Sequence, residues 1–159
     1  MENLLSLIEE NAKLTEEQLA AMLGQSVEEI HHQIRQYEKA GVIKGYKALI
    51  DWDKVDKDII TAFIEVKVTP QRDSGFEQVA ERIMQFEEVD SVYLMSGGFD
   101  LSVTVSGKSF KEVAMFVAER LSPLDNVLST GTHFILRKYK DKGVLFGAEK
   151  SDERGKISL

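Results

Sequence analysis

The chain contains no cysteine and little positive charge, and these two deficits exclude several classes of protein. Without thiols there are no disulfides, thiolate nucleophiles or thiolate metal ligands, and nothing in the composition indicates an oxidising compartment. The 20 Lys and Arg residues are outnumbered by 27 Asp and Glu, which gives a formal net charge of -7. This charge argues against indiscriminate binding to nucleic acids or membranes, but it allows a small local basic surface.

Long apolar runs are also missing from the sequence. No stretch approaches the roughly 20 apolar residues of a membrane span. The N-terminus "MENLLSLIEENAKLTEEQ" carries acids where a signal peptide has Lys or Arg followed by an apolar run. We therefore expect a cytoplasmic protein with no membrane partner, and 159 residues are enough for one good core or two small ones.

Residues 2–41 place their apolar side chains at helical spacing, which predicts three short helices. The second helix should begin at Thr15, with Gln18 completing a capping box, and the third at Ser26 with Glu29 in the same role. Gly24 falls in the short gap between them. A helix, a tight turn and a helix are typical of a helix-turn-helix motif, although many structural helical hairpins share the pattern. The apolar positions are Leu4, Leu5, Ile8, Leu19, Met22, Leu23, Ile30, Ile34 and Tyr37.

The segment after Gly41, "VIKGYKALIDWDKV", predicts a short strand that leads into a linker. We place a domain boundary there, so that residues 1–54 form the helical domain and 55–147 a second domain. The first domain is acidic, with six Lys and Arg against ten Asp and Glu. Residues 148–159 are polar and aperiodic, and we expect either a flexible tail or an arm that packs on a partner subunit.

The second domain alternates between strand and helix patterns. "IITAFIEVKV", "DSVYLMS", "DLSVTVSG" and "VLSTGTHFILRKYK" predict strands, and stripes beginning at Phe76 and Phe110 predict two helices. The second stripe comprises Phe110, Val113, Ala114, Val117 and Leu121. The order β-α-β-β-α-β indicates an α+β, ferredoxin-like fold with both helices on one face of the sheet. The other face would carry Phe63, Tyr93, Met95 and Ile135, which is too apolar to face water, and we infer a homodimer.

These features together resemble the leucine-responsive and asparagine-responsive transcriptional regulators, the Lrp/AsnC or feast/famine family. The similarity covers the whole chain. It rests on the helix-turn-helix, on "AGVIKGYKALID", on "SGGFDLSVTV" and on "LSTGTHFILRKYK", in that order and spacing.

The resemblance implies an N-terminal winged helix-turn-helix that binds double-stranded operator DNA, followed by a ferredoxin-like ligand-sensing module, the RAM domain. It also implies that dimers assemble further, for example into an octamer of four dimers. Small effectors, commonly amino acids, would bind between dimers and change assembly or DNA affinity. We expect no cofactor and no metal, and the neighbouring pair His31 and His32 projects about 100° apart on a helix, which does not suit shared ligation.

The predicted recognition helix is unusually acidic for DNA binding. Glu28 and Glu29 lie at its N-terminus, and Gln33 stands where similar family members usually have a basic residue. Both glutamates have a purely local explanation, because acids in a first turn complement the helix dipole. Base reading is still compatible with Gln and Arg side chains. The predicted DNA-binding residues are Ser26, His31, His32, Gln33, Arg35, Gln36, Lys39 and Lys44.

The turn "SGGFD" has two interpretations. From its residues alone it is a hairpin turn whose glycines supply positive φ. The resemblance instead implies that its Gly-x-x-Asp pattern, Gly97 to Asp100, lines the effector crevice. Backbone N–H groups could then bind a carboxylate, and the Asp100 carboxylate an ammonium, so that the turn selects a zwitterion. The predicted ligand residues are Met95, Gly97, Gly98, Phe99, Asp100, Thr130 and Thr132.

Two functions therefore remain open at the level of sequence. The first is a transcriptional regulator that responds to an amino acid. The second is an amino-acid-sensing module whose DNA binding is weak or lost. An enzyme is not expected, because no Cys-His, Ser-His-Asp, phosphate-loop or metal signature is present.

Overall fold

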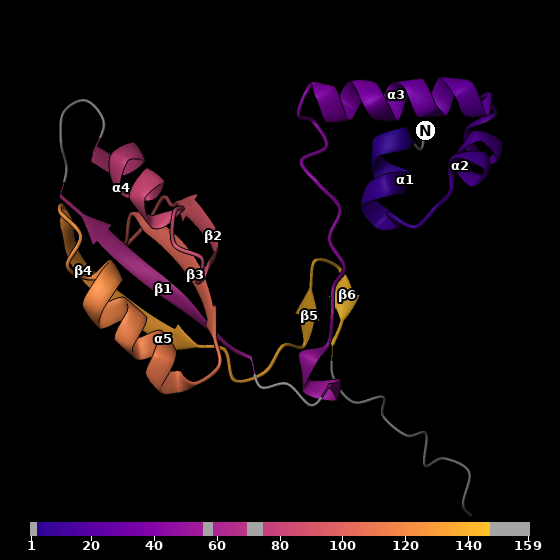
Figure 1. The fold of residues 1–159 in the computed structure, drawn as a ribbon. Coiled ribbons are helices and arrows are strands. Elements are labelled where there is room, and N and C mark those ends of the chain that lie inside the picture. Colours follow the sequence, from indigo (N-terminus) through magenta and orange to yellow (C-terminus); the bar gives the residue numbers. More distant parts are fainter. Residues whose placement is uncertain (1–2, 56–58, 70–74, 147–159) are drawn as a thin grey trace, which may run out of the picture. The chain divides into compact units, whose positions relative to one another are not determined.

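The chain divides into two compact units, Met1–Ile50 and Asp51–Leu159. The computed structural model describes residues 3–55, 59–69 and 75–146 (Figure 1). No helix in these residues is long and apolar enough to cross a membrane.

The first unit contains the three predicted helices, α1 (Leu4–Glu10), α2 (Glu16–Leu23) and α3 (Val27–Lys39). Both predicted capping boxes are present, at Thr15 with Gln18 and at Ser26 with Glu29. Gly24 ends α2 in the left-handed conformation at φ 66°, which allows the sharp turn into α3. The core of this unit is small and consists of Leu4, Leu7, Leu19, Ala20 and Ile30, with partly buried residues packed around it.

The predicted short strand after Gly41 is wrong. Residues 42–50 form no strand, and η1 (Trp52–Lys54) is a short 3-10 helix. A strand needs a backbone partner, and within the described residues this segment pairs with neither sheet. Its apolar side chains stay largely exposed, including Val42, Tyr46 and Ile50.

The second unit has the predicted β-α-β-β-α-β order. Its four-stranded antiparallel sheet has the order β2-β3-β1-β4. The last predicted strand is too long: β4 ends at Phe134, and residue 140 instead begins a small separate hairpin of β5 and β6. The elements are β1 (Ile60–Val68), α4 (Gly75–Ile83), β2 (Val89–Leu94), β3 (Leu101–Gly107), α5 (Phe110–Phe116), the π-helical segment η2 (Val117–Leu121), β4 (Val127–Phe134), β5 (Lys140–Asp141) and β6 (Val144–Leu145).

Helices α4 and α5 cover one face of this sheet, and the core lies between the helices and that face (Figure 1). Alternate residues of β1 and β3 are fully buried there, because successive strand side chains point to opposite faces. The predicted stripe on the second helix is partly wrong: Ala114 is exposed, whereas Phe116 is buried and packs edge-on against Phe86 with ring centroids 5.4 Å apart. The widened π turn begins directly after Phe116, so a regular helical period no longer applies.

Candidate DNA-binding and effector sites

The first turn of α3 is built around Ser26. Its Oγ accepts the N–H of Glu29 at 3.2 Å, and Glu29 Oε2 accepts the N–H of Ser26 at 2.9 Å. The same carboxylate oxygen also accepts from the Ser26 hydroxyl at 2.9 Å, and the two hydrogen bonds that it accepts from Ser26 hold the pKa of Glu29 below its ordinary value. Glu28 is exposed, and its side chain makes no hydrogen bond or ion pair within the part of the chain described. Both acids lie in the first turn of α3 and complement the helix dipole, but only Glu29 takes part in the cap.

The core-facing side of α3 defines its outward side. Ile30 is fully buried, and Ile34 and Tyr37 pack on the same core. By helical geometry, the opposite stripe carries Glu28, His32, Arg35, Gln36 and Lys39, and all five are exposed. The last four belong to the predicted DNA-binding set.

The other predicted DNA-binding residues are placed differently. Gln33 is half-buried and its Nε2 donates to Gln25 Oε1 at 2.8 Å. His31 Nδ1 lies 2.9 Å from Glu16 Oε1. Ser26 is occupied by the cap, whereas Lys44 is exposed beyond the helix. Ser26, His31 and Gln33 are thus held by partners off the outward stripe. On the stripe, Gln36 Nε2 lies 2.9 Å from His32 Nε2, and Arg35 donates to Glu38 of the same helix.

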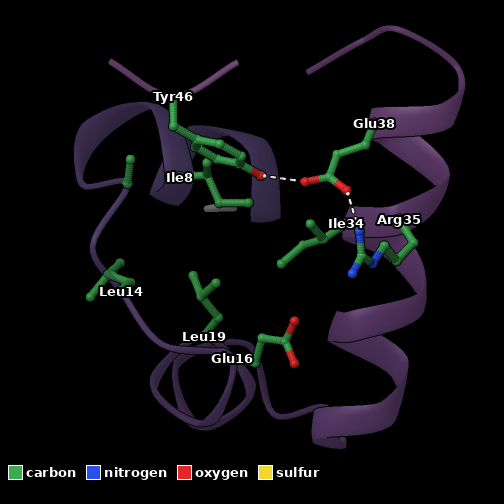
Figure 2. A pocket seen from close by; sticks show the side chains of 9 residues that line it. Ile8, Leu14, Glu16, Leu19, Ile34, Arg35, Glu38 and Tyr46 are labelled. Carbon is green, nitrogen blue, oxygen red and sulfur yellow. Dashed lines mark hydrogen bonds and ion pairs between the residues drawn. The ribbon is translucent and has the colours of Figure 1, made fainter. Parts of the chain in front are cut away.

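A pocket of about 270 Å³ lies on one flank of α3 within the first unit (Figure 2). Glu38 stands at its rim and uses both carboxylate oxygens. Oε2 accepts from Arg35 Nη1 and Oε1 accepts from the Tyr46 hydroxyl, each at 3.3 Å. Glu38 and Tyr46 are not among the residues predicted from the sequence; the only sequence signal for this contact is the three-residue spacing between Arg35 and Glu38. The apolar side chains that line the pocket are Ile8, Ala12, Leu14, Leu19 and Ile34.

The predicted effector turn is the six-residue connection between β2 and β3, which pair antiparallel on either side of it. Gly97 has φ 152°, which favours glycine, but Gly98 does not have a positive φ. A Cβ at either position would meet open space, so neither glycine is required by close packing. Met95 is exposed, and Phe99 is half-buried with its ring 5.9 Å from that of Phe63.

Asp100 connects this turn to β1. Its Oδ2 accepts the Val68 N–H at 2.8 Å, and its own N–H donates to the Val66 carbonyl at 3.0 Å. The Asp100 residue is half-buried. Its Oδ2 takes the place of a backbone carbonyl as the acceptor of the Val68 N–H. Within the described residues the second oxygen accepts no hydrogen bond and could still accept from a ligand.

Thr130 and Thr132 lie on β4 opposite Val66 and Ile64 of β1. This register turns both threonines toward the helix-covered face of the sheet. The Thr130 hydroxyl lies 2.9 Å from that of Ser122, which ties β4 to the end of η2. Asp100 and Thr130 are therefore at the same end of the sheet, on the two sides of β1.

The uncovered face of the sheet carries Phe63, Tyr93 and Ile135, as predicted. Phe63 lies opposite His133 on β4, and Tyr93 lies opposite Ser102 on β3. Tyr93 is 59% exposed and Ile135 40% exposed in the single chain. A further pair not found from the sequence, His133 Nε2 and Glu65 Oε1, lies 3.4 Å apart on this face.

Both units match known families. Residues 2–44 match the model for winged helix-turn-helix DNA-binding domains, and residues 61–145 match the Lrp/AsnC ligand binding domain. The chain is 50% identical over 156 residues to an uncharacterized HTH-type transcriptional regulator, YugG, of Bacillus subtilis, covering 98% of this chain and 94% of that one.

More distant relatives are also named as regulators. The leucine-responsive regulatory protein of Rhizobium meliloti is 28% identical, covering 84% of this chain and 85% of the relative. The crystal structure of a transcriptional regulator from Neisseria meningitidis, solved as a complex with L-Met, matches with a TM-score of 0.70 at 25% identity over 87% of this chain and 88% of the other. From the matched domains and these relatives, the chain belongs to the Lrp/AsnC family of transcriptional regulators.

Proposed function

We propose that the protein is a DNA-binding transcriptional regulator in the cytoplasm whose assembly or DNA affinity responds to an amino acid. The observation that carries the proposal is the outward stripe of α3, where His32, Arg35, Gln36 and Lys39 are exposed on a capped helix. In a helix-turn-helix this is the surface that enters the major groove. The relatives are named as transcriptional regulators, and we propose no catalytic activity.

Different side chains of and near the stripe would contact bases and phosphates. Gln36 can read adenine and Arg35 guanine, while Lys39 and Lys44 supply charge for phosphates. Glu28 can accept a hydrogen bond from cytosine, but it repels phosphate. With these few cations, binding should be modest at physiological salt and should weaken further as salt rises.

The effector site is proposed at the turn Gly97–Asp100, together with Met95. The second oxygen of Asp100 would accept from the ammonium group of an amino acid, and backbone N–H groups at the two glycines would donate to its carboxylate. The L-Met complex of the Neisseria relative supports an amino acid as the class of ligand. Thr130 and Thr132 would contribute from a neighbouring dimer.

The assembly is proposed to be a homodimer through the uncovered sheet face, with further association into a higher oligomer such as an octamer. Tyr93 and Ile135 are exposed, and Phe63 lies on the same face of β1; these apolar side chains support this surface as a dimer interface. Sedimentation of a monomer at micromolar concentration would overturn this part of the proposal.

The test of the function is a gel-shift titration with the DNA upstream of the protein's own gene, with and without a panel of amino acids. We expect a complex at low salt whose affinity changes with at least one amino acid. The acidic first domain favours the alternative, an amino-acid sensor with weak or lost DNA binding. Amino-acid binding without any DNA complex at low salt would establish that alternative.

A further inference from the structure

Arg35 is the only arginine of the first unit, and an acidic residue of the same helix already contacts it. Its Nη1 donates to Glu38 Oε2 at 3.3 Å, while Glu38 Oε1 accepts from the Tyr46 hydroxyl, as Figure 2 shows. Tyr46 lies in the segment after α3, eight residues beyond Glu38. One carboxylate therefore joins the recognition helix's arginine to the segment that leads out of the first unit.

The surroundings of Glu38 favour this arrangement. Its side chain is 33% exposed, whereas the Arg35 side chain is 69% exposed. The carboxylate sits above the pocket, where Ile8, Leu19 and Ile34 contribute apolar surface (Figure 2). Partial removal from water strengthens hydrogen bonds to a charged group.

The same contact affects the acidity of the Tyr46 hydroxyl. Burial, the nearby charge of Glu38 and the hydrogen bond to Glu38 raise the pKa of Tyr46 above its ordinary value, and the charge of Arg35 acts in the opposite direction. The Glu38 carboxylate thus interacts with both the phenol and the guanidinium.

We propose that Glu38 and Tyr46 are positioning residues for Arg35: Glu38 holds the guanidinium at the rim of the pocket in competition with DNA, and Tyr46 fixes the Glu38 carboxylate. This inference rests on the proposed DNA-binding function. A guanidinium that donates to a carboxylate has fewer N–H groups free for a phosphate or a guanine edge. Because the Arg35 side chain is largely exposed and the two residues are only three positions apart on the helix, the effect on affinity should be about twofold.

The test is a double-mutant cycle with Glu38→Gln, Arg35→Gln and both changes together, measured with the upstream DNA at low salt and without effector. Glu38→Gln should tighten binding about twofold to threefold in the presence of Arg35. In the Arg35→Gln background the same change should have a clearly smaller effect. Tyr46→Phe should also tighten binding, but by less than Glu38→Gln.

Two controls separate positioning from a general effect of charge. Glu10→Gln removes the same charge from an exposed residue at the end of α1, and it should affect binding less than Glu38→Gln does. If Glu38→Gln acts equally with and without Arg35, or no more strongly than Glu10→Gln, then Glu38 contributes only bulk charge and the proposal is overturned. If Tyr46→Phe leaves affinity unchanged, the role of Tyr46 is overturned.

A measurement without DNA tests the contact itself. The pKa of Tyr46, assigned by comparison with Tyr46→Phe, should fall in Glu38→Gln and rise in Arg35→Gln. An unchanged pKa in both variants would contradict the contact on which the proposal rests. If the pKa responds but no variant binds DNA at low salt, the contact stands, while the proposed function and the positioning role both fail.

Discussion

The two units of the chain are stabilised in different ways. Among the residues that the structure describes, five form the buried core of the helical unit and thirteen that of the sheet unit. The helical unit adds local devices to its small core, namely two capping boxes and the left-handed turn at Gly24. A small unit has little stability to spare, so the DNA-binding half should be the more sensitive to substitution.

Truncation of one core residue in each unit should give the largest effects. Ile30→Ala removes a fully buried side chain and should cost about 2–5 kcal/mol, enough to unfold the small helical unit. Ile64→Ala makes the same change in the larger core, which should remain folded. NMR spectra should lose the dispersed signals of the first unit only in Ile30→Ala. Loss of both units together in either variant would show that they do not fold independently.

Asp100 distinguishes a structural role from ligand binding. Asp100→Ala removes the acceptor of the Val68 N–H and should destabilise the sheet unit by about 1–3 kcal/mol. Asp100→Asn can still accept that hydrogen bond through its one oxygen, but an NH2 group then replaces the second oxygen that would accept from an ammonium, a loss of roughly 1.5–3 kcal/mol in effector binding. Thermal unfolding and calorimetric titration measure the two effects. Equal effector binding by wild type and Asp100→Asn would remove Asp100 from the site.

A charge on the uncovered sheet face should weaken the proposed dimer. Met95→Glu places an acid beside that face and should weaken dimerisation tenfold or more, which corresponds to about 1.4 kcal/mol. Met115→Glu is a matched control, because Met115 is 42% exposed on α5 and Met95 is 41% exposed. Sedimentation at several concentrations should show a shift for Met95→Glu alone. The same shift in both variants would argue against the sheet face as the interface.

The cap of α3 should contribute a smaller and pH-dependent part of the first unit's stability. Ser26→Ala should cost about 1 kcal/mol. Because folding lowers the pKa of Glu29 from 4.5, its contribution is present above pH 4.5 and is lost as pH falls through the lowered value. Glu29→Gln should therefore make the acid unfolding of the first unit less steep. If Glu29→Gln left the dependence of stability on pH below 4.5 unchanged, the role of Glu29 would be contradicted.

Glu28→Gln should have the smallest effect. It removes an exposed charge without disturbing the cap and should raise DNA affinity by an amount equivalent to 1 kcal/mol or less, roughly fivefold at most. The gain should shrink as salt rises. Weaker binding in this variant would instead indicate that Glu28 reads a base.

Local patterns predicted much of this architecture. The caps at Thr15 and Ser26 require residues only three positions apart, and the order of strands and helices follows from which face each element buries. The segment after Gly41 has a strand-like sequence, but no partner in the described chain pairs with it.

The candidate sites were less predictable because they depend on distant partners. The sequence placed Asp100 in a turn, but only the fold brings its carboxylate to the Val68 N–H, 32 residues away. It likewise gave Gln33 and His31 as free to contact DNA, whereas Gln25 and Glu16 bind them. Neither partner is marked by a local motif.

The central claim is that DNA binding by the first unit responds to an amino acid bound at the second. It is tested most directly by the anisotropy of labelled upstream DNA, titrated with wild type and Asp100→Asn at low salt, with and without each amino acid. We predict equal DNA affinity for the two proteins without effector, and a change with at least one amino acid for wild type only. No DNA binding by wild type, or the same response in both proteins, would contradict the account.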